Sequence, residues 1–197
     1  MVLIREPFLN YENKYMDESG NLKELITSIK NGDENAFEEL VKKTQKSVFS
    51  IAFKMIGNWH DAFDVCQEVY LKIFRYIDSY DPDKKFQVWL YKIVINSCYN
   101  LLNSRTPRTS SLDEIEGAPL EVLNFLEEDY GNKQLLEKAL TFLNLLSPTE
   151  RAVFILRDVQ NIPSKEISKI VGCTQITVRR HSNNARKKMR TFLENVI

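Results

Sequence analysis

The sequence contains few residues that interrupt helices, with only 6 Gly and 6 Pro among 197 residues. Because glycine and proline are the least favourable residues in a helix interior, their scarcity favours long helices. Hydrophobic residues make up 43% of the chain and charged residues 27%, a balance typical of a globular protein. We therefore expect an all-α chain with little or no sheet.

Long hydrophobic runs are also missing. No window approaches the roughly 18 consecutive apolar residues of a membrane-spanning helix, and the first twenty residues do not resemble a secretory signal. We expect a cytoplasmic protein with no membrane insertion. The cysteines Cys66, Cys98 and Cys173 are odd in number and lie in separate apolar stretches, which predicts buried hydrophobic side chains rather than a disulfide framework.

The residue clusters of common enzyme classes are absent as well. His60 and His181 lie near no Cys, His or Asp cluster with metal-ligand spacing. No glycine-rich phosphate loop and no nucleophile elbow is present. We therefore expect no enzymatic activity, no cofactor and no metal site.

The net charge is zero, but the charges are sorted along the chain. Residues 150–197 contain ten Lys and Arg against four Asp and Glu, whereas residues 112–131 contain seven acidic residues and no basic one. This asymmetry predicts a basic C-terminal part that binds phosphates and an acidic connecting segment.

Apolar residues at intervals of three and four predict three helices in the N-terminal part. The first runs from Asp33, which can cap it, to Gly57. The second runs from about Asp61 to the turn at 81–83, and the third spans about 86–102. The apolar stripe expected to bury the second helix comprises Val65, Val69, Leu71, Ile73, Phe74 and Ile77.

Four more helices are predicted near 132–146, 148–159, 164–171 and 174–195. Ser147 and Glu150 form a capping box, and we expect Ser164 and Thr174 to cap the last two helices. The coarse picture is two helical domains joined by an acidic linker. The expected parts are an N-terminal extension at 1–20 with no assigned role, a domain at 21–105, a linker at 106–131 and a domain at 132–197.

The last two predicted helices form a helix-turn-helix around Val171-Gly172-Cys173, where Gly172 can adopt the positive φ of a sharp turn. We expect their shared core to contain Ile167, Val171, Ile176 and Val178. Arginine can bind guanine and asparagine adenine in the major groove, and the basic residues that follow can bind phosphates. An ordinary basic surface helix remains an alternative interpretation of this segment alone.

Three stretches, at 32–40, 61–72 and 86–93, together with the helix-turn-helix, resemble the extracytoplasmic-function sigma factors of bacterial RNA polymerase in order and spacing. The resemblance covers about residues 20–195. It implies that 21–105 corresponds to region 2 of the family and 132–197 to region 4. It further implies that the chain binds core RNA polymerase, directs it to promoters through the minus-35 and minus-10 elements, and promotes strand opening.

The resemblance assigns residues to three surfaces. Docking on the coiled coil of the polymerase β′ subunit is implied for Asp61, Asp64, Gln67 and Glu68. Binding of the minus-10 element is implied for Tyr80, Lys84, Lys85, Asn96 and Asn100, which combine stacking, phosphate attraction and base-edge hydrogen bonds. Binding of the minus-35 element is implied for Gln175, Thr177, Arg179, Arg180, His181, Asn183, Asn184, Arg186 and Lys187.

The sequence departs from the family at three positions. Basic residues usually stand where His181 and Asn184 are, and an apolar residue where Ser182 is. The promoter sequence and the packing at Ser182 are therefore open, and the neutral residues predict a flatter salt dependence of DNA binding.

The resemblance also implies further partners, namely the polymerase β subunit and an anti-sigma protein that clamps both domains. The acidic linker either mimics nucleic acid in a basic polymerase channel or is merely a solubilising tether. A rival hypothesis is a stand-alone helix-turn-helix regulator that binds duplex DNA as a dimer without polymerase.

Overall fold

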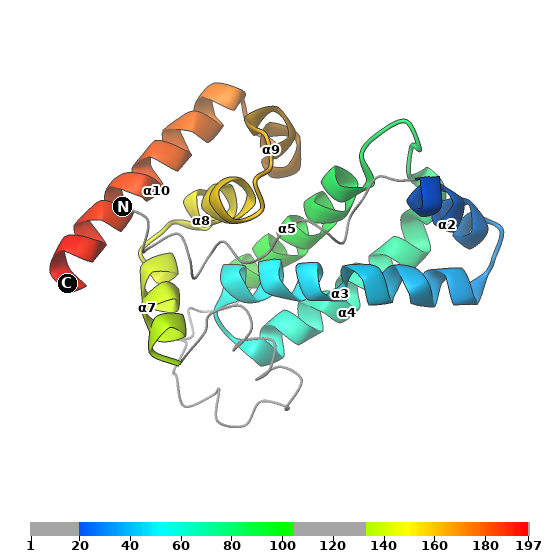
Figure 1. The fold of residues 1–197 in the computed structure, drawn as a ribbon, viewed down its shortest axis with the longest axis horizontal. Coiled ribbons are helices and arrows are strands. Elements are labelled where there is room, and N and C mark those ends of the chain that lie inside the picture. The colour runs from blue at the N-terminus through cyan, green and yellow to red at the C-terminus, as the bar shows by residue number, and fades with distance from the viewer. Residues whose placement is uncertain (1–19, 105–132, 197) are drawn as a thin grey trace.

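The computed structural model describes residues 20–104 and 133–196, and every regular element within them is helical (Figure 1). The predicted all-α class is confirmed. The predicted extension and linker, and the boundaries around the linker, lie outside the described residues. We call 20–104 the N-terminal half and 133–196 the C-terminal half.

The N-terminal half contains α2 (Gly20–Lys30), α3 (Glu34–Ile56), α4 (Trp59–Tyr76), the 3₁₀ turn η1 (Ile77–Ser79) and α5 (Phe86–Ser104). The Asp33 carboxylate accepts hydrogen bonds from the N–H groups of Asn35 and Ala36, at 2.9 and 3.2 Å, so the predicted cap is confirmed. Gly57 ends α3 with φ 83°, as the sequence predicts. The helices α3, α4 and α5 pack against one another in all three pairs.

The C-terminal half contains α7 (Lys133–Asn144), α8 (Pro148–Phe154), the π-helical turn η3 (Ile155–Val159), α9 (Ser164–Val171) and α10 (Gln175–Val196). Both hydrogen bonds of the predicted capping box at Ser147 are present. The predicted cap at Ser164 is wrong, because Pro163 occupies the N-cap position and Ser164 is the first helical residue. Thr174 caps α10 as predicted, since its hydroxyl accepts from the Thr177 N–H at 3.2 Å.

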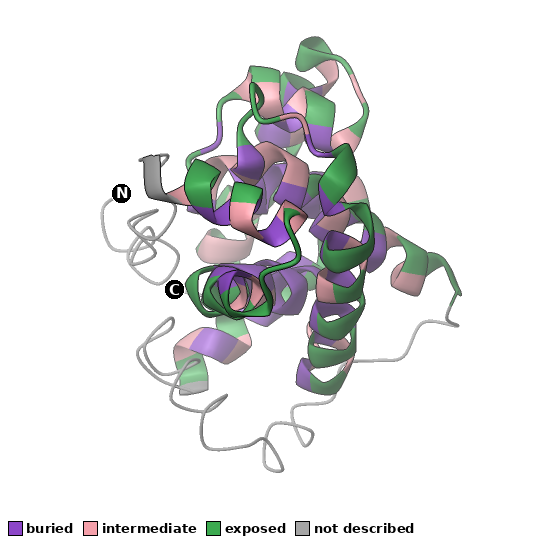
Figure 2. Cartoon of the chain, turned by 90° about the vertical axis from the view of Figure 1, so that its right-hand side faces the viewer, coloured by how far each residue is buried: buried purple, intermediate pink, exposed green. Residues whose placement is uncertain are grey.

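The two halves lie side by side rather than apart. Helix α5 packs against α9, and α3 contacts α7, α8 and η3. In Figure 1, α5 and α3 of the N-terminal half lie beside the C-terminal helices, and the buried residues of both halves form one continuous hydrophobic cluster. Figure 2 shows these buried residues where helices face each other and the exposed residues on the outside. The sequence predicted two domains and gave no indication that they would pack together.

Candidate nucleic-acid and polymerase interfaces

The turn between α9 and α10 has the geometry of a helix-turn-helix. Gly172 adopts φ 73°, and its N–H donates to the Ser168 carbonyl at 3.0 Å, which closes the last turn of α9. No atom lies within 4 Å of a Cβ built on Gly172, so the glycine is required by backbone conformation rather than by crowding. The predicted glycine conformation is therefore confirmed.

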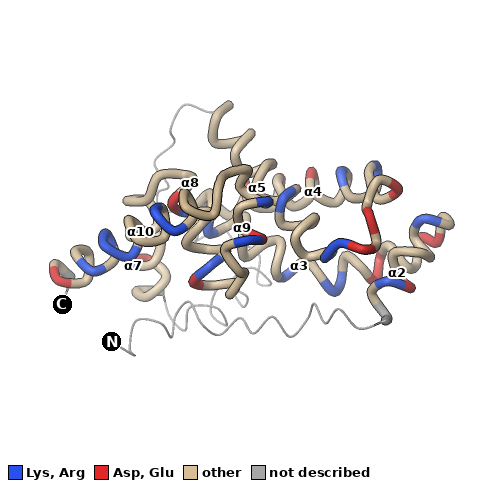
Figure 3. Tube along the Cα trace, turned by 90° about the horizontal axis from the view of Figure 1, so that it is seen from above, with Lys and Arg blue, Asp and Glu red and all other residues tan. Residues whose placement is uncertain are grey.

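Helix α10 has an inner and an outer face. Val178, Ser182 and Ala185, spaced by four and three residues, are fully buried, and α10 packs against α8 and α9. The outer face carries the predicted minus-35 residues that are exposed. They are Gln175, Arg179, Arg180, Asn183, Asn184, Arg186 and Lys187. Figure 3 shows basic residues, in blue, at intervals along α10.

The expected contribution of Ile176 to the shared core is wrong. Its side chain is 78% exposed, because it lies on the outer face next to Gln175 rather than in register with Val178. Ile167 and Val178 are buried as expected, and Val171 is half-buried.

Three predicted minus-35 residues are engaged within the C-terminal half or lie partly inside it. Thr177 is half-buried, and its hydroxyl is 2.9 Å from that of Thr174. His181 is half-buried, with a buried Nδ1 that has no hydrogen-bond partner among the described residues. Arg186 donates through Nε and Nη2 to one carboxylate oxygen of Asp158, at 3.1 and 2.6 Å. Arg186 therefore ties α10 to η3, which reduces its availability for phosphate.

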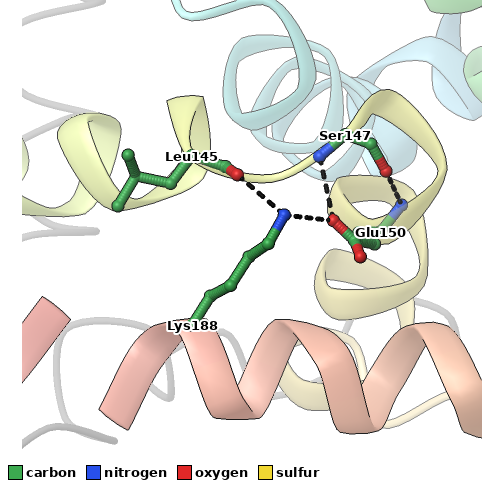
Figure 4. Close-up of polar contacts among 4 residues, drawn as sticks. All are labelled: Leu145, Ser147, Glu150 and Lys188. Carbon is green, nitrogen blue, oxygen red and sulfur yellow. Dashed lines mark hydrogen bonds and ion pairs between the residues drawn. The ribbon is translucent and has the colours of Figure 1, made fainter. Parts of the chain in front are cut away.

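A second tie joins α10 to the start of α8 (Figure 4). Lys188 Nζ donates to a Glu150 carboxylate oxygen at 2.8 Å and to the Leu145 carbonyl at 3.1 Å. The same Glu150 oxygen accepts from the Ser147 N–H at 3.1 Å. Burial alone would raise the pKa of Glu150, but the hydrogen bonds from Lys188 and Ser147 and the charge of Lys188 outweigh it and lower that pKa. The sequence analysis did not predict this structural role of Lys188.

The predicted minus-10 residues divide into buried and exposed groups. Tyr80 is buried, with its ring centroid 5.4 Å from those of Phe86 and Trp89, and its hydroxyl donates to the Lys84 carbonyl. The ring therefore packs against the core in this conformation, and Tyr80 also lines a pocket beside the loop. Lys30 Nζ donates to the carbonyls of Asp78 and Tyr80, at 3.2 and 2.8 Å, which fixes the start of the loop.

A pocket of about 200 Å³ lies between α2 and the loop at 80–86. Its lining combines apolar and basic side chains, including Ile26, Lys23 and Lys84. Lys84 is exposed and pairs with Asp81 at 3.0 Å, whereas Lys85 pairs with Glu166 of α9 at 3.1 Å. The pocket and the loop lysines thus lie next to one another.

Asn96 and Asn100 are exposed on α5, where Lys92 is exposed one turn earlier. The spacing of four residues places the three side chains on one face of the helix. Sequence reasoning missed Lys92, although its position four residues before Asn96 was a usable signal.

Helix α4 presents the predicted polymerase-docking residues to solvent. Asp64, Gln67 and Glu68 are exposed, and Asp61 is half-buried in the first turn, where its N–H donates to the Asn58 side chain at 3.0 Å. Glu68 pairs with Lys72.

The same surface of α4 exposes large apolar side chains. Leu71 and Phe74 are both 64% exposed, and Phe63 is 49% exposed. The expectation that Leu71 and Phe74 help to bury the helix is wrong, because Val65, Val69 and Ile73 already form the buried stripe. Sequence reasoning therefore missed an apolar element of this candidate surface.

Within 20–104 and 133–196, no group of three or more His, Cys, Asp or Glu is placed to hold a metal ion. No helix in the same ranges is long and apolar enough to cross a membrane. Cys66 and Cys98 are buried as expected, whereas Cys173 is only half-buried.

Comparison with protein families identifies two matches, one in each half of the chain. Residues 40–108 match the Sigma-70 region 2 model, and residues 136–189 match the Sigma-70 region 4 model. The first match begins within α3 and continues through α5, and the second covers the helix-turn-helix.

Curated relatives agree with these matches. The chain is 31% identical over 171 residues to the ECF RNA polymerase sigma-E factor of Escherichia coli K12, covering 83% of this chain and 89% of that protein. It is 26% identical over 185 residues to the ECF RNA polymerase sigma factor SigW of Bacillus subtilis, covering 89% and 98%.

Two solved structures share the fold. One is CnrH in complex with the cytosolic domain of CnrY, with TM-score 0.64 and 20% identity, covering 88% of this chain and 97% of that one. The other is the sigma factor RpoE of Bartonella quintana in complex with the anti-sigma factor NepR, with TM-score 0.64 and 18% identity, covering 80% and 96%. Together with the family matches and the curated relatives, these likenesses lead to one assignment. The chain belongs to the extracytoplasmic-function branch of the sigma-70 family, whose members are RNA polymerase sigma factors that act in promoter-specific transcription initiation rather than as enzymes.

Proposed function

We propose that this chain binds core RNA polymerase, directs it to promoters through minus-35 and minus-10 elements, and promotes strand opening. The observation that carries the proposal is the division of α10 into a buried stripe and an outer face of Arg and Asn. Such a helix, presented after a sharp turn, can enter the major groove with its reading residues toward the base edges. Arg179 and Arg180 suit guanine there, and Asn183 and Asn184 suit adenine.

The proposed minus-10 surface joins the loop at 80–86 to the polar stripe of α5. Lys92, Asn96 and Asn100 offer one positive charge and two amides along a single helix face. The neighbouring pocket of about 200 Å³ combines apolar walls with lysines, which suits an unstacked base and its phosphate. Tyr80 acts here as a support that shapes the loop, because its ring is packed inside.

The proposed polymerase-docking surface is the outer face of α4. Acidic and amide side chains at Asp64, Gln67 and Glu68 suit a basic partner helix, since complementary charges steer association. The apolar side chains of Phe63, Leu71 and Phe74 supply area whose burial favours binding.

The partner set includes the β′ coiled coil, the β subunit and promoter DNA, all in the cytoplasm. An anti-sigma protein is proposed as well, because RpoE of Bartonella quintana was solved with an anti-sigma factor and has the same fold.

Reconstitution tests the proposal against the alternative of a stand-alone DNA-binding regulator. Purified chain and core polymerase are expected to form a complex that initiates RNA on some members of a promoter library. Replacing both Asp64 and Gln67 with alanine should weaken polymerase binding without altering the circular dichroism spectrum. Gln45→Ala, at an exposed position on α3 rather than on α4, is the matched control. A chain that shifts duplex DNA alone but binds no polymerase refutes the proposal.

A further inference from the structure

Helix α2 precedes the stretch that matches the region 2 model, which begins at residue 40. Its position is fixed by packing, because Leu25, Ile26 and Ile29 are buried and the helix contacts α3 and η1 (Figure 1). An isolated helix of 11 residues is marginal in water, so these contacts are what hold α2 in place. They place α2 beside the loop at 80–86, where the minus-10 surface is proposed.

Lys30, the last residue of α2, holds the start of this loop from outside. Its ammonium group donates to the Asp78 carbonyl at 3.2 Å and to the Tyr80 carbonyl at 2.8 Å. These carbonyls lie at the end of η1, where the Tyr80 N–H donates to the Ile77 carbonyl at 3.0 Å. Carbonyls at a helix end lack partners within the helix, and a cation stabilises them. The half-buried Lys30 side chain therefore joins α2 to the point at which the loop leaves η1.

The loop has internal contacts that define its shape once its start is held. The Asp81 carboxylate accepts from the Asp83 N–H at 3.1 Å and pairs with Lys84 at 3.0 Å. The hydrogen bond from Lys84 is the largest cause that lowers the pKa of Asp81, and the charge of Lys30 lowers it further. The Lys84 N–H also donates to the Asp81 carbonyl at 3.0 Å. Loss of Lys30 should therefore loosen the loop at its N-terminal end.

The pocket of about 200 Å³ is built by both elements. Helix α2 supplies Leu22, Lys23 and Ile26, whereas the loop supplies Tyr80 and Lys84 among others. Apolar side chains suit the face of an unstacked base, and the exposed ammonium group of Lys23 suits the phosphate beside it. The shape of the pocket depends on where the loop lies relative to α2, and the hydrogen bonds of Lys30 determine that placement.

We propose that α2 is part of the minus-10 interface, in which Lys30 is a positioning residue that keeps the base pocket formed and Lys23 binds the phosphate of the captured nucleotide. This role of α2 rests on the proposed function and adds two residues to its minus-10 surface. Lys30 donates to protein carbonyls, so its loss acts through the loop. Because only chains with an ordered loop capture a base, the apparent affinity for the single strand falls with the ordered fraction.

The first measurement is hydrogen exchange of the loop amides in the full chain, which needs neither polymerase nor DNA. Lys30→Met keeps an unbranched side chain and removes both hydrogen bonds. Their loss should shift the loop about tenfold toward a relaxed state and speed exchange of the Tyr80 and Lys84 N–H groups by a similar factor. Lys30→Arg keeps the charge and the donors, so it should restore slow exchange. Unchanged exchange in Lys30→Met overturns the positioning role.

The second measurement is binding of a single-stranded oligonucleotide by polymerase reconstituted with each variant. The oligonucleotide carries the minus-10 element of a promoter on which the wild-type chain initiates RNA. Lys30→Met should weaken binding by up to about tenfold without changing its salt dependence, because the residue contacts no phosphate. Lys23→Gln should weaken binding and also flatten the slope of log affinity against log salt by about 0.7, the value for one phosphate contact on a single strand. Lys42→Gln, which removes an exposed cation from α3 outside the pocket, is the matched control and should change neither quantity.

Thermal unfolding identifies a variant that fails to fold, and Lys30→Gln then replaces Lys30→Met because it keeps a polar side chain. Binding of a minus-35 duplex by the same polymerase complexes should be unchanged. Equal losses for the duplex and the single strand, or no loss for the single strand in Lys30→Met, overturn the positioning role, and a wild-type salt slope in Lys23→Gln overturns the phosphate contact. A wild-type complex that initiates RNA on no template refutes the proposed function and the DNA-binding role of α2 with it, a result distinct from any difference between variants.

Discussion

Replacing Glu150 with alanine tests how α10 is held in position for DNA. The Glu150 side chain is only 9% exposed and serves two elements at once. It accepts from the Ser147 N–H at the start of α8, and it pairs with Lys188 of α10 (Figure 4). The alanine variant therefore loses half of the capping box and the tie to α10 together.

The magnitude follows from these two contacts. The hydrogen bond that the Ser147 N–H donates to the charged Glu150 carboxylate contributes about 1 kcal/mol. The ion pair between Glu150 and Lys188 contributes about another 1 kcal/mol, because it is less exposed to water than a surface pair. Glu150→Ala should therefore lower the free energy of unfolding by about 2 kcal/mol, whereas Glu150→Gln, which keeps a neutral acceptor for Ser147, should cost about half as much.

Urea unfolding monitored by circular dichroism measures both variants, with exposed Glu38→Ala as the matched control. The pKa of Glu150 is lowered in the folded chain, so its contribution is present above the unfolded pKa and is lost as the pH falls through the folded value. The difference between wild type and Glu150→Gln should therefore vanish in acid. A Glu150→Ala cost no larger than that of Glu38→Ala refutes the structural role of the contact.

Three further substitutions have separate expected outcomes. Gly172→Ala should lower the free energy of unfolding by about 1 kcal/mol, measured by thermal unfolding, because the positive φ is strained for alanine while the space is open; a cost near zero would mean that the turn relaxes. Ser182→Ala should raise the melting temperature by a few degrees, about 1 kcal/mol, because a fully buried hydroxyl without a partner among the described residues is removed; a lower melting temperature would indicate a partner for that hydroxyl. Arg179→Ala should weaken DNA binding by about 1–3 kcal/mol, and binding assays with promoter sequence variants should show that the loss is confined to one base position. A uniform loss across all sequences would mean that Arg179 contacts a phosphate.

Local signals predicted the helices well, because their ends are determined by residues close in sequence. The cap at Asp33 and the helix end at Gly57 depend only on neighbouring atoms, and both were predicted from the sequence. The Ser164 cap failed by one position, since Pro163 has the extended conformation that an N-cap needs.

Apolar periodicity was less reliable at Leu71, Phe74 and Ile176, which are exposed. Apolar residues at a period of three to four define one face of a helix. The period cannot distinguish a residue that is buried in the core from one that is exposed at the surface. Tyr80, a candidate for base stacking, packs beside Phe86 and Trp89, a burial that the sequence did not predict. The hydrogen bonds between the two halves could not be predicted at all, because their partners are far apart in the sequence. Tyr91 and Gln160 are 69 residues apart, and Met55 and Arg151 are 96 residues apart.

The charge of α10 overstates what it can offer to DNA. Two of its basic residues are already committed, Arg186 to Asp158 and Lys188 to Glu150. A phosphate contact from either would first break an internal pair, so the net counterion release per residue is smaller than for an unpaired cation. His181 and Asn184 are two further positions on this helix that carry neither lysine nor arginine. Binding by this helix should therefore depend more on the base contacts of Arg179, Arg180 and Asn183, and less on salt, than its count of lysines and arginines suggests.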